Sequence, residues 1–457
     1  MSNSRLQELL ACPRCDKVPL QISDDGYRCN GCKSRFPSIG RIPWLFAEPD
    51  ASLGEWRNRL HSELQRLAHE TKQLRAELDA GGLLAQTEKR LALHLQAASQ
   101  HRQALQQILA PIDAQSMQAS YESHLALRTR LPRDQGLNTY YANAHRDWAW
   151  GDAENAASLD ELRRALQVSG GEAAGNTLVL GAGTCRLAYD VHMSFAPSLT
   201  VAMDFNPLLL LIADKVTRGE SLQLHEFPIA PRTGKDVAVL RELAAPSPVR
   251  EGFSLVLGDV LRAPFRTHSF DTVVTPWLID IVPEDLPVLA SRINRLLKTG
   301  GRWVNFGSLA FETAEHARRY GPEETIAIVE QAGFERPHIS EETIPYMCSP
   351  ASRHGRQETV FTFAAMKNAD VSPPPRHRAL PDWIVTGQEA VPLTPSFRTQ
   401  ALSTRIYSYI MTLIDGRRTI EDMAEILEQQ KLMSRAEAIP AIRNFLTRMY
   451  DDSQRQA

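Results

Sequence analysis

The feature that most constrains the fold is an alternation, between residues 137 and 367, of short β-rich strings with amphipathic helical stretches. The strings have the composition of buried strands and lie at residues 177–180, 199–203, 253–257, 272–274 and 303–306. Strands separated by helices in this way form a parallel sheet with helices on its faces. We therefore expect a doubly wound, Rossmann-like α/β domain over residues 137–368.

A glycine turn follows the first expected strand. Gly181 and Gly183 stand where this strand passes into a helix, and a turn of this kind lets the backbone approach a ligand closely. Arg186 replaces the third glycine of a dinucleotide fingerprint, which disfavours a nicotinamide cofactor. Asp204 ends the second strand, 21 residues after Gly183, where a carboxylate can accept hydrogen bonds from both ribose hydroxyls.

Three further elements follow in the order typical of class I methyltransferases. Asp259 ends the third strand, where its carboxylate could accept from an adenine amino group. The fourth strand leads into Pro276 and Asp280, and a glycine pair at residues 300–301 precedes the fifth strand. Five elements in this order and spacing predict an S-adenosylmethionine-dependent methyltransferase.

These residues resemble the carnosine N-methyltransferase family, also called the N2227-like methyltransferases, over residues 137–367. The similarity is carried by the segment 140–148, the glycine loop 181–188, and the segments 277–280 and 304–309. The resemblance implies a class I methyltransferase fold, S-adenosyl-L-methionine as the cofactor and N-methylation as the reaction.

The resemblance also implies roles for single residues on the cofactor side. It places Asn143 and Arg146, from the segment ahead of the sheet, on the cofactor. It places Asp204 on the ribose and Asp259 near the adenine. Gly181, Gly183 and Pro276 complete the expected cofactor-binding set. A buried, hydrogen-bonded helix face is the alternative role for Asn143 and Arg146.

On the acceptor side, the resemblance places Asp280 against a substrate imidazole. Glu312 stands near the position of the family's substrate-contacting histidine, and Gln357 near that of a substrate tyrosine, with Tyr346 close by. We therefore expect an imidazole- or histidine-containing small molecule or peptide as substrate, contacted by Asp280, Glu312 and Tyr346. A carboxylate on the distal ring N–H would stabilise the imidazolium that forms, which makes Asp280 the catalytic candidate. A helix N-cap is its alternative role.

Two other functions remain open on the sequence. The first is a methyltransferase that acts on another peptide or natural-product nucleophile. The second is a non-catalytic scaffold with a degenerate methyltransferase domain, against which the intact Gly181, Gly183, Asp204 and Asp259 argue.

Residues 1–48 contain two Cys-x2-Cys pairs, Cys12 with Cys15 and Cys29 with Cys32. Two such knuckles complete a tetrahedral site for Zn²⁺ with no open position, so we expect a structural zinc ribbon. This segment resembles the small zinc-ribbon proteins that partner tRNA and protein methyltransferases. That resemblance implies an activating or docking role and a contact with a peptide or protein partner.

The remaining segments are expected to be mainly helical. A leucine heptad from residue 60 to 78, broken by a glycine pair, predicts a helical hairpin within residues 49–136. Residues 369–377 form a proline-rich linker. Residues 378–457 resemble the PqqD-like winged-helix module, which binds peptides, and a plain helical cap is the alternative. Thr419 and Asp422 form an expected capping box in this tail.

The formal net charge of −3 shows no basic excess of the kind that nucleic-acid binding leaves in a sequence. The first residues lack an apolar core and a cleavage site of a signal peptide. No apolar run approaches the roughly 20 residues of a membrane span. We therefore expect a cytoplasmic protein with no membrane segment.

Overall fold

The computed structural model describes residues 2–113, 137–172, 174–313, 315–374 and 390–456. The chain divides into two compact units, Met1–Pro381 and Asp382–Ala457. Parts of three expected segments lie outside the described residues, namely 114–136 of the hairpin region, 375–377 of the linker and 378–389 of the tail.

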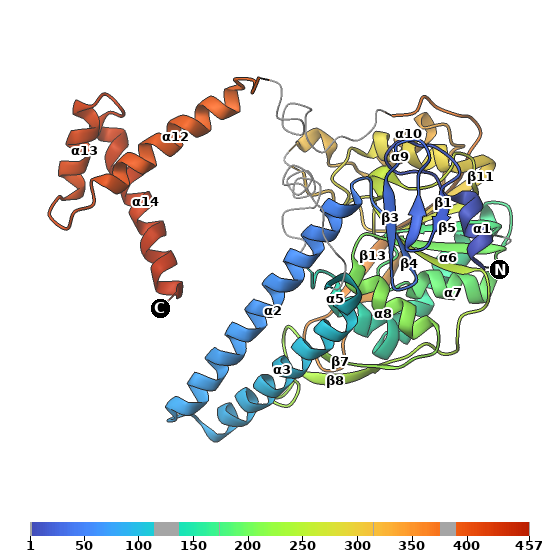
Figure 1. The fold of residues 1–457 in the computed structure, drawn as a ribbon, viewed down its shortest axis with the longest axis horizontal. Coiled ribbons are helices and arrows are strands. Elements are labelled where there is room, and N and C mark those ends of the chain that lie inside the picture. The colour runs from blue at the N-terminus through green and yellow to red at the C-terminus, as the bar shows by residue number, and fades with distance from the viewer. Residues whose placement is uncertain (1, 114–136, 173, 314, 375–389, 457) are drawn as a thin grey trace. The chain divides into compact units, whose positions relative to one another are not determined.

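The five expected strands are all present and form the parallel centre of one sheet (Figure 1). They are β5 (Asn176–Leu180), β6 (Leu199–Asp204), β9 (Phe253–Gly258), β10 (Phe270–Pro276) and β11 (Leu297–Gly307). The Rossmann-like class I methyltransferase fold is thereby confirmed. The sheet is mixed, however, because β13 (Arg356–Met366) and β12 (His338–Tyr346) add an antiparallel pair beside β11. A separate antiparallel pair consists of β7 (Leu222–Glu226) and β8 (Val239–Leu243).

Successive residues of the central strands point to opposite faces of the sheet, as the period of two requires. Val179 and Ala202 belong to one buried cluster, whereas Leu178 and Val201 belong to another. The first cluster is covered by α6 (Asp152–Val168), α7 (Arg186–Phe195) and α8 (Pro207–Thr217). The second is covered by α9 (Leu286–Leu296) and α10 (Pro322–Gln331). Both faces of the sheet centre are covered, which explains why β5, β6, β9 and β10 are mostly buried.

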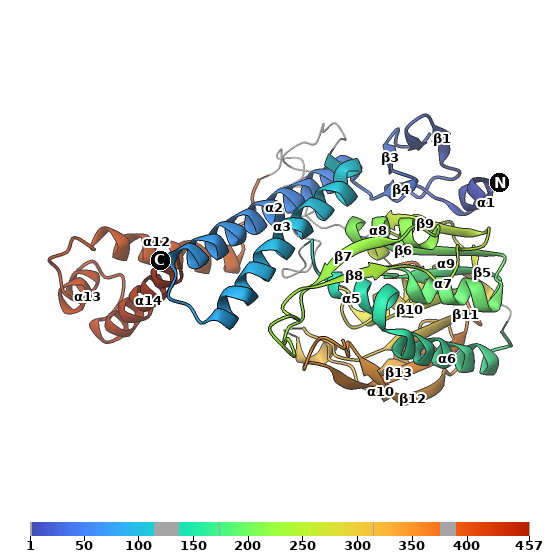
Figure 2. The same ribbon diagram turned by 90° about the horizontal axis from the view of Figure 1, so that it is seen from below.

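The N-terminal segment joins this sheet instead of standing apart from it (Figure 2). It comprises α1 (Ser2–Leu9), β1 (Gln21–Ser23), β2 (Gly26–Arg28), β3 (Arg35–Ile39) and β4 (Ile42–Leu45). Strand β4 pairs in parallel with β9, with Trp44 opposite Leu257 and Leu45 opposite Gly258. The sheet thus has eleven strands in the order β1-β2-β3-β4-β9-β6-β5-β10-β11-β13-β12.

A helical hairpin follows β4 directly, as the heptad predicts. Its arms, α2 (Pro49–Ala80) and α3 (Ala85–Asp113), lie side by side in Figure 1. Leu60 and Leu67 of α2 share a buried cluster with Leu105 and Leu109 of α3. The leucine seam is therefore paired within the chain, next to the covering helices of the sheet.

The C-terminal unit has its own small core. It consists of α12 (Pro395–Thr412), α13 (Ile420–Gln429) and α14 (Arg435–Gln456), whose apolar residues form one cluster. The predicted capping box is present, since Thr419 accepts from the Asp422 N–H and Asp422 accepts from the Thr419 N–H. Within residues 390–456 there is no strand, so the part of the tail that is described is helical without a wing.

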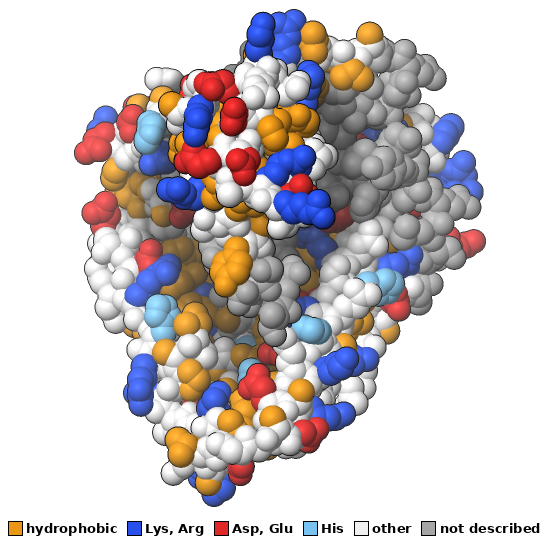
Figure 3. Space-filling view, turned by 90° about the vertical axis from the view of Figure 1, so that its left-hand side faces the viewer, with side chains coloured by type: hydrophobic (Ala, Val, Ile, Leu, Met, Phe, Trp, Pro, Cys, Tyr) orange, Lys and Arg blue, Asp and Glu red, His pale blue; other side chains and the backbone are white. Residues whose placement is uncertain are grey.

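Charged side chains of both signs are interspersed over the face drawn in Figure 3, in keeping with the formal net charge of −3. Among the described residues, no helix combines the length and apolar character required to cross a bilayer.

Candidate functional site

A cavity opens at the carboxyl ends of β5, β6 and β10, the edge of the sheet at which open α/β folds bind ligands. The space free of protein atoms measures about 940 Å³, which includes open solvent at the mouth of the cavity. Most of the predicted cofactor residues line it, together with one predicted acceptor residue. They are Asn143, Arg146, Gly181, Gly183, Asp204, Pro276 and Tyr346.

The glycine loop shapes the floor of the cavity. Gly181 and Gly183 have φ values of +67° and +56°, in the left-handed region that favours glycine. A Cβ atom at Gly181 would lie 2.7 Å from Leu278 Cδ1, whereas one at Gly183 would meet nothing within 4 Å. A side chain at Gly181 would thus force Leu278 to shift, and Gly183 leaves room for a ligand to approach the backbone.

Asp204 lies at the end of β6 with its carboxylate fixed by the backbone. Its Oδ2 accepts from the Gly183 N–H at 2.8 Å and its Oδ1 from the Asn206 N–H at 2.8 Å. Burial raises the pKa of Asp204 to about 6, although these backbone donors act in the opposite direction. The acid is thus tied to the glycine loop and faces the same cavity.

Arg146 begins a π-helical turn (Arg146–Trp150) after the short helix α5 (Tyr141–His145). Its guanidinium donates to Asp147 Oδ1 at 2.8 Å and to Glu154 Oε1 at 3.1 Å. These two carboxylates raise the pKa of Arg146 despite its burial. Arg146 therefore cross-links this turn to α6 and is held in the wall of the cavity, which its neighbour Asn143 also lines.

Asp259, expected near the adenine, is not among the residues that line the cavity. Its Oδ1 accepts from the Leu261 N–H at 2.9 Å and caps the 3-10 helix η2 (Val260–Arg262). In this structure Asp259 thus shapes the loop after β9, and its contact with the cofactor remains a prediction.

Asp280 is 8% exposed and is not among the residues that line the cavity, although its chain neighbours Leu278 and Ile281 are. Its Oδ2 accepts from Ser308 Oγ at 2.5 Å and from the Ala310 N–H at 3.0 Å. Among the residues that the structure describes, none donates to its Oδ1. The alternative role as a helix cap is not observed, since α9 begins at Leu286 after Asp285.

The other two predicted acceptor residues differ in position. Tyr346, at the end of β12, lines the cavity, and its ring centroid lies 4.7 Å from that of Trp277. Glu312 is exposed and is absent from the residues that line the cavity. Glu312 follows the long strand β11 in an irregular segment, whose direction the sequence pattern does not determine.

The comparison with protein families decides the class to which this site belongs. The family model for carnosine N-methyltransferase matches residues 138–368, half of the chain. The chain belongs to this family. The carnosine N-methyltransferase of Dictyostelium discoideum is 28% identical over 152 residues, which cover 30% of this chain and 32% of that protein. The match thus spans about a third of the length of the curated relative.

Two solved methyltransferase structures resemble the chain at 16% identity. One is phosphoethanolamine N-methyltransferase 2 of Haemonchus contortus with S-adenosyl-L-methionine, with a TM-score of 0.32 and coverage of 52% of this chain and 62% of that one. The other, from Thermotoga maritima, is described as a possible histamine N-methyltransferase, with a TM-score of 0.31 and coverage of 51% and 98%.

Several residues of the carnosine N-methyltransferase domain that line the cavity were not predicted. Asp190 on α7 accepts from Arg186 Nε at 2.9 and 3.1 Å, and burial raises the pKa of Asp190 to about 6. Trp277 has a φ of +50° and packs on Phe306 and Tyr346. The i,i+4 spacing of Arg186 and Asp190 after the glycine loop is a signal that could have revealed the first. No local pattern marks the backbone conformation of Trp277.

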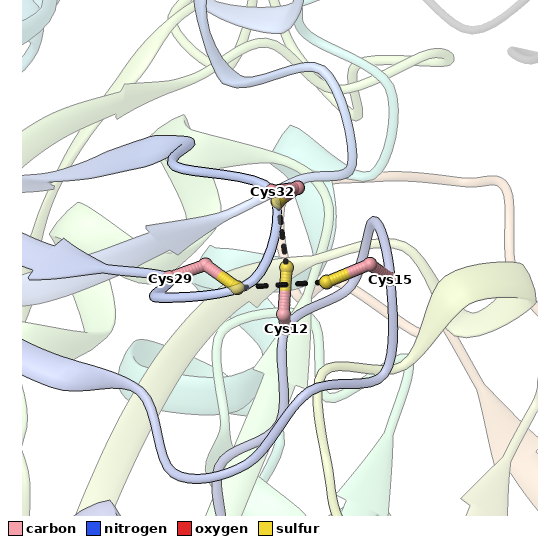
Figure 4. A group of neighbouring side chains, drawn as sticks. All are labelled: Cys12, Cys15, Cys29 and Cys32. Carbon is pink, nitrogen blue, oxygen red and sulfur yellow. Dashed lines mark hydrogen bonds between the residues drawn. The ribbon is translucent and has the colours of Figure 1, made fainter.

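The four N-terminal cysteines converge as their spacing predicts (Figure 4). Their sulfur atoms all lie within 4.8 Å of one another, with Cys12 and Cys32 at 3.6 Å and Cys15 and Cys29 at 3.5 Å. Four thiolates about 2.3 Å from a tetrahedral Zn²⁺ would be roughly 3.8 Å apart, so the cluster fits this ion. Burial raises the pKa of Cys12 and of Cys29, and a bound cation would offset the cost of ionising them.

Proposed function

We propose that the chain is an S-adenosylmethionine-dependent N-methyltransferase that acts on an imidazole- or histidine-containing small molecule or peptide, and that the four cysteines hold a structural zinc ion. Membership of the carnosine N-methyltransferase family supports this proposal. The observation that carries the choice of acceptor is the environment of Asp280, whose one oxygen is fixed while the other accepts no hydrogen bond from the described residues.

The cofactor half of the cavity would bind its ligand through groups that are already positioned. Asp204 would accept hydrogen bonds from the ribose hydroxyls. These would replace part of its present hydrogen bonding to the glycine loop. Gly183 would permit close approach of the methionine part, and Asn143 would add a polar contact from the opposite wall. When bound, S-adenosylmethionine supplies an electrophilic methyl group on a sulfonium sulfur.

The acceptor half would orient a nitrogen lone pair toward that methyl group. A neutral imidazole nitrogen needs no strong base, so catalysis depends on position and on charge. Asp280 Oδ1 would accept from the distal ring N–H, which fixes the tautomer and stabilises the ring as it becomes cationic. Ser308 and Ala310, by holding Oδ2, would keep this carboxylate in place. Tyr346 and Trp277 offer flat apolar surfaces beside the ring.

Calorimetry with S-adenosylmethionine and methyl-transfer assays over free imidazoles and histidyl peptides test the proposal. We expect cofactor binding and transfer to at least one imidazole. Cofactor binding with transfer only to other nucleophiles would favour the second methyltransferase hypothesis. A protein that binds no cofactor would favour the scaffold hypothesis.

For partners, we propose that the C-terminal unit, which is helical over the described residues 390–456, contributes to binding of a peptide or protein. Tyr407, Met411 and Ile414 support this, since each exposes more than two fifths of its surface on or just after α12. Met411→Glu should then reduce turnover of a histidyl peptide more than turnover of free imidazole. Equal turnover ratios in the variant and the parent protein would contradict this role.

A further inference from the structure

The first knuckle of the N-terminal ribbon, residues 12–15, is held by the segment that follows β9. Arg262 in η2 donates through Nη2 to the carbonyls of Pro13 and, at 2.9 Å, Arg14. Both carbonyls lie between Cys12 and Cys15, so one guanidinium fixes the loop that carries two of the four thiols. The same η2 turn is the one that Asp259 caps.

Backbone hydrogen bonds reinforce this junction on the N-terminal side of the knuckle. The Ala11 N–H donates to the Pro264 carbonyl at 2.9 Å, and the Arg266 N–H donates to the Leu9 carbonyl at 2.8 Å. Leu10 is fully buried and forms a β-bridge with Phe265. The ribbon and the loop after β9 therefore form a single packed layer.

A second contact connects the ribbon to β6 through Gly258 of β9. Leu45 of β4 pairs with Gly258, and a Cβ atom at Gly258 would lie 3.4 Å from the Leu45 carbonyl and 3.3 Å from Met203 Sδ. Met203 immediately precedes Asp204. Only a glycine fits between them without displacement, so Gly258 of β9, the strand between β4 and β6, is in close contact with both neighbours.

The helix that begins after β4 provides a third contact. Trp56 of α2 is 1% exposed, and its ring centroid lies 6.0 Å from that of Phe205. Phe205 follows Asp204 and lines the cavity. Displacement of β4 would shift the start of α2 at Pro49 and with it the support of Phe205.

We propose that metal bound to the four thiols sets the affinity of the cavity for S-adenosylmethionine, through the contacts that join the ribbon to the loop after β9, to Gly258 and to Phe205. The proposal rests on the proposed function, since it assumes that the cofactor binds beside Asp204. A short ribbon with little core of its own depends on its metal for order. Loss of the metal frees the knuckle and β4, and the cofactor then has to order the end of β6 on binding.

The test begins with calorimetry of the zinc-loaded full chain, which should contain one zinc per chain and bind S-adenosylmethionine. Removal of zinc by a chelator should weaken binding at least tenfold, and addition of zinc should restore it. Because coupling is reciprocal, saturating S-adenosylmethionine should raise the affinity of the chain for zinc by the same factor. Zinc-loaded protein that fails to bind the cofactor would contradict the proposed function. Equal cofactor affinity with and without zinc would overturn only the coupling.

A matched pair of variants keeps the test decisive if the zinc-free chain unfolds. Arg262→Ala removes the hydrogen bonds to the carbonyls of the knuckle. Arg266→Ala removes a side-chain hydrogen bond of 3.1 Å to the Glu8 carbonyl, at the same junction but away from the thiols. We expect Arg262→Ala to bind zinc or S-adenosylmethionine threefold to tenfold more weakly and Arg266→Ala to match the parent chain. Parent-like binding of both ligands by Arg262→Ala, or an equal loss in the two variants, would overturn the proposal.

Discussion

The two halves of the proposed site differ in what holds their functional groups. On the cofactor side, Gly181, Gly183 and Asp204 are fixed by strand ends and by backbone hydrogen bonds. On the acceptor side, Asp280 and Tyr346 are fixed by side chains and loops from distant segments. The first half is thus built into the strand ends of the sheet, whereas the second is assembled from residues far apart in the chain. We therefore expect a substitution in one half to leave the other largely intact.

The largest effect is expected from a substitution on the acceptor side. Asp280→Asn keeps the shape of the side chain but removes the charge that would stabilise a cationic ring. Turnover of the imidazole substrate should fall about a hundredfold, comparable to the loss of one preorganised donor at a reacting centre. Affinity for S-adenosylmethionine, measured on the same preparation, should not change.

Glu312→Gln is the matched control for this substitution, because Glu312 is exposed, whereas Asp280 is buried next to the cavity-lining Leu278 and Ile281 in the chain. Its turnover should stay within about twofold of the parent protein. Full turnover in Asp280→Asn would remove the main support for an imidazole acceptor.

On the cofactor side, Asp204→Ala should weaken S-adenosylmethionine binding roughly tenfold to a hundredfold, or about 1.5–3 kcal/mol, through loss of charge-assisted hydrogen bonds. Calorimetry measures this directly. Asp190→Asn provides the comparison, since Asp190 also lines the cavity but is paired with Arg186. A similar loss in both variants would indicate that general negative potential, and not recognition of the ribose, explains the effect.

The contrast between the halves also explains which predictions held. The five strands, the glycine turn and the position of Asp204 follow from hydrophobic period and chain order, which are local properties of the sequence. The place of Glu312 does not, because an irregular segment after β11 carries it away from the cavity. Nor does the pairing of β4 with β9 follow from local pattern, since strand partners more than two hundred residues apart are selected by tertiary packing.

A third prediction concerns pH. Burial raises the pKa of Asp204 to about 6, and ribose hydroxyls would bind its ionised form. Cofactor affinity should therefore be constant above about pH 7 and fall about tenfold as the pH decreases to 5, by proton linkage. Titrations across this range, with Asp204→Asn as the reference, measure the effect. An equal pH dependence in the Asn variant would assign the titration to another group.

The smallest expected effects are those of substituting the two glycines of the loop, one at a time. Gly183→Ala adds a methyl group where a ligand would approach, so it should weaken cofactor binding roughly threefold to tenfold, or about 0.7–1.4 kcal/mol. Its cost in stability should be only about 1 kcal/mol of backbone strain at positive φ. Gly181→Ala also meets Leu278 and should lower stability further, by about 1–3 kcal/mol in total. Thermal melting measures the stability of the two variants, and calorimetry measures their affinity for the cofactor. A larger loss of cofactor affinity in Gly181→Ala than in Gly183→Ala would contradict this view of the loop.

The pairing of β4 with β9 has a practical consequence for anyone who expresses the family domain by itself. A chain begun near residue 137 would leave Leu257 and Gly258 without their partners in β4 and would present β9 as an open, apolar sheet edge. Unpaired edges of this kind template association with other chains, and natural proteins avoid them with charges, bulges or covering segments. Such a fragment would be prone to aggregate, whereas a chain that retains residues 1–60 carries the cover that its own sheet requires.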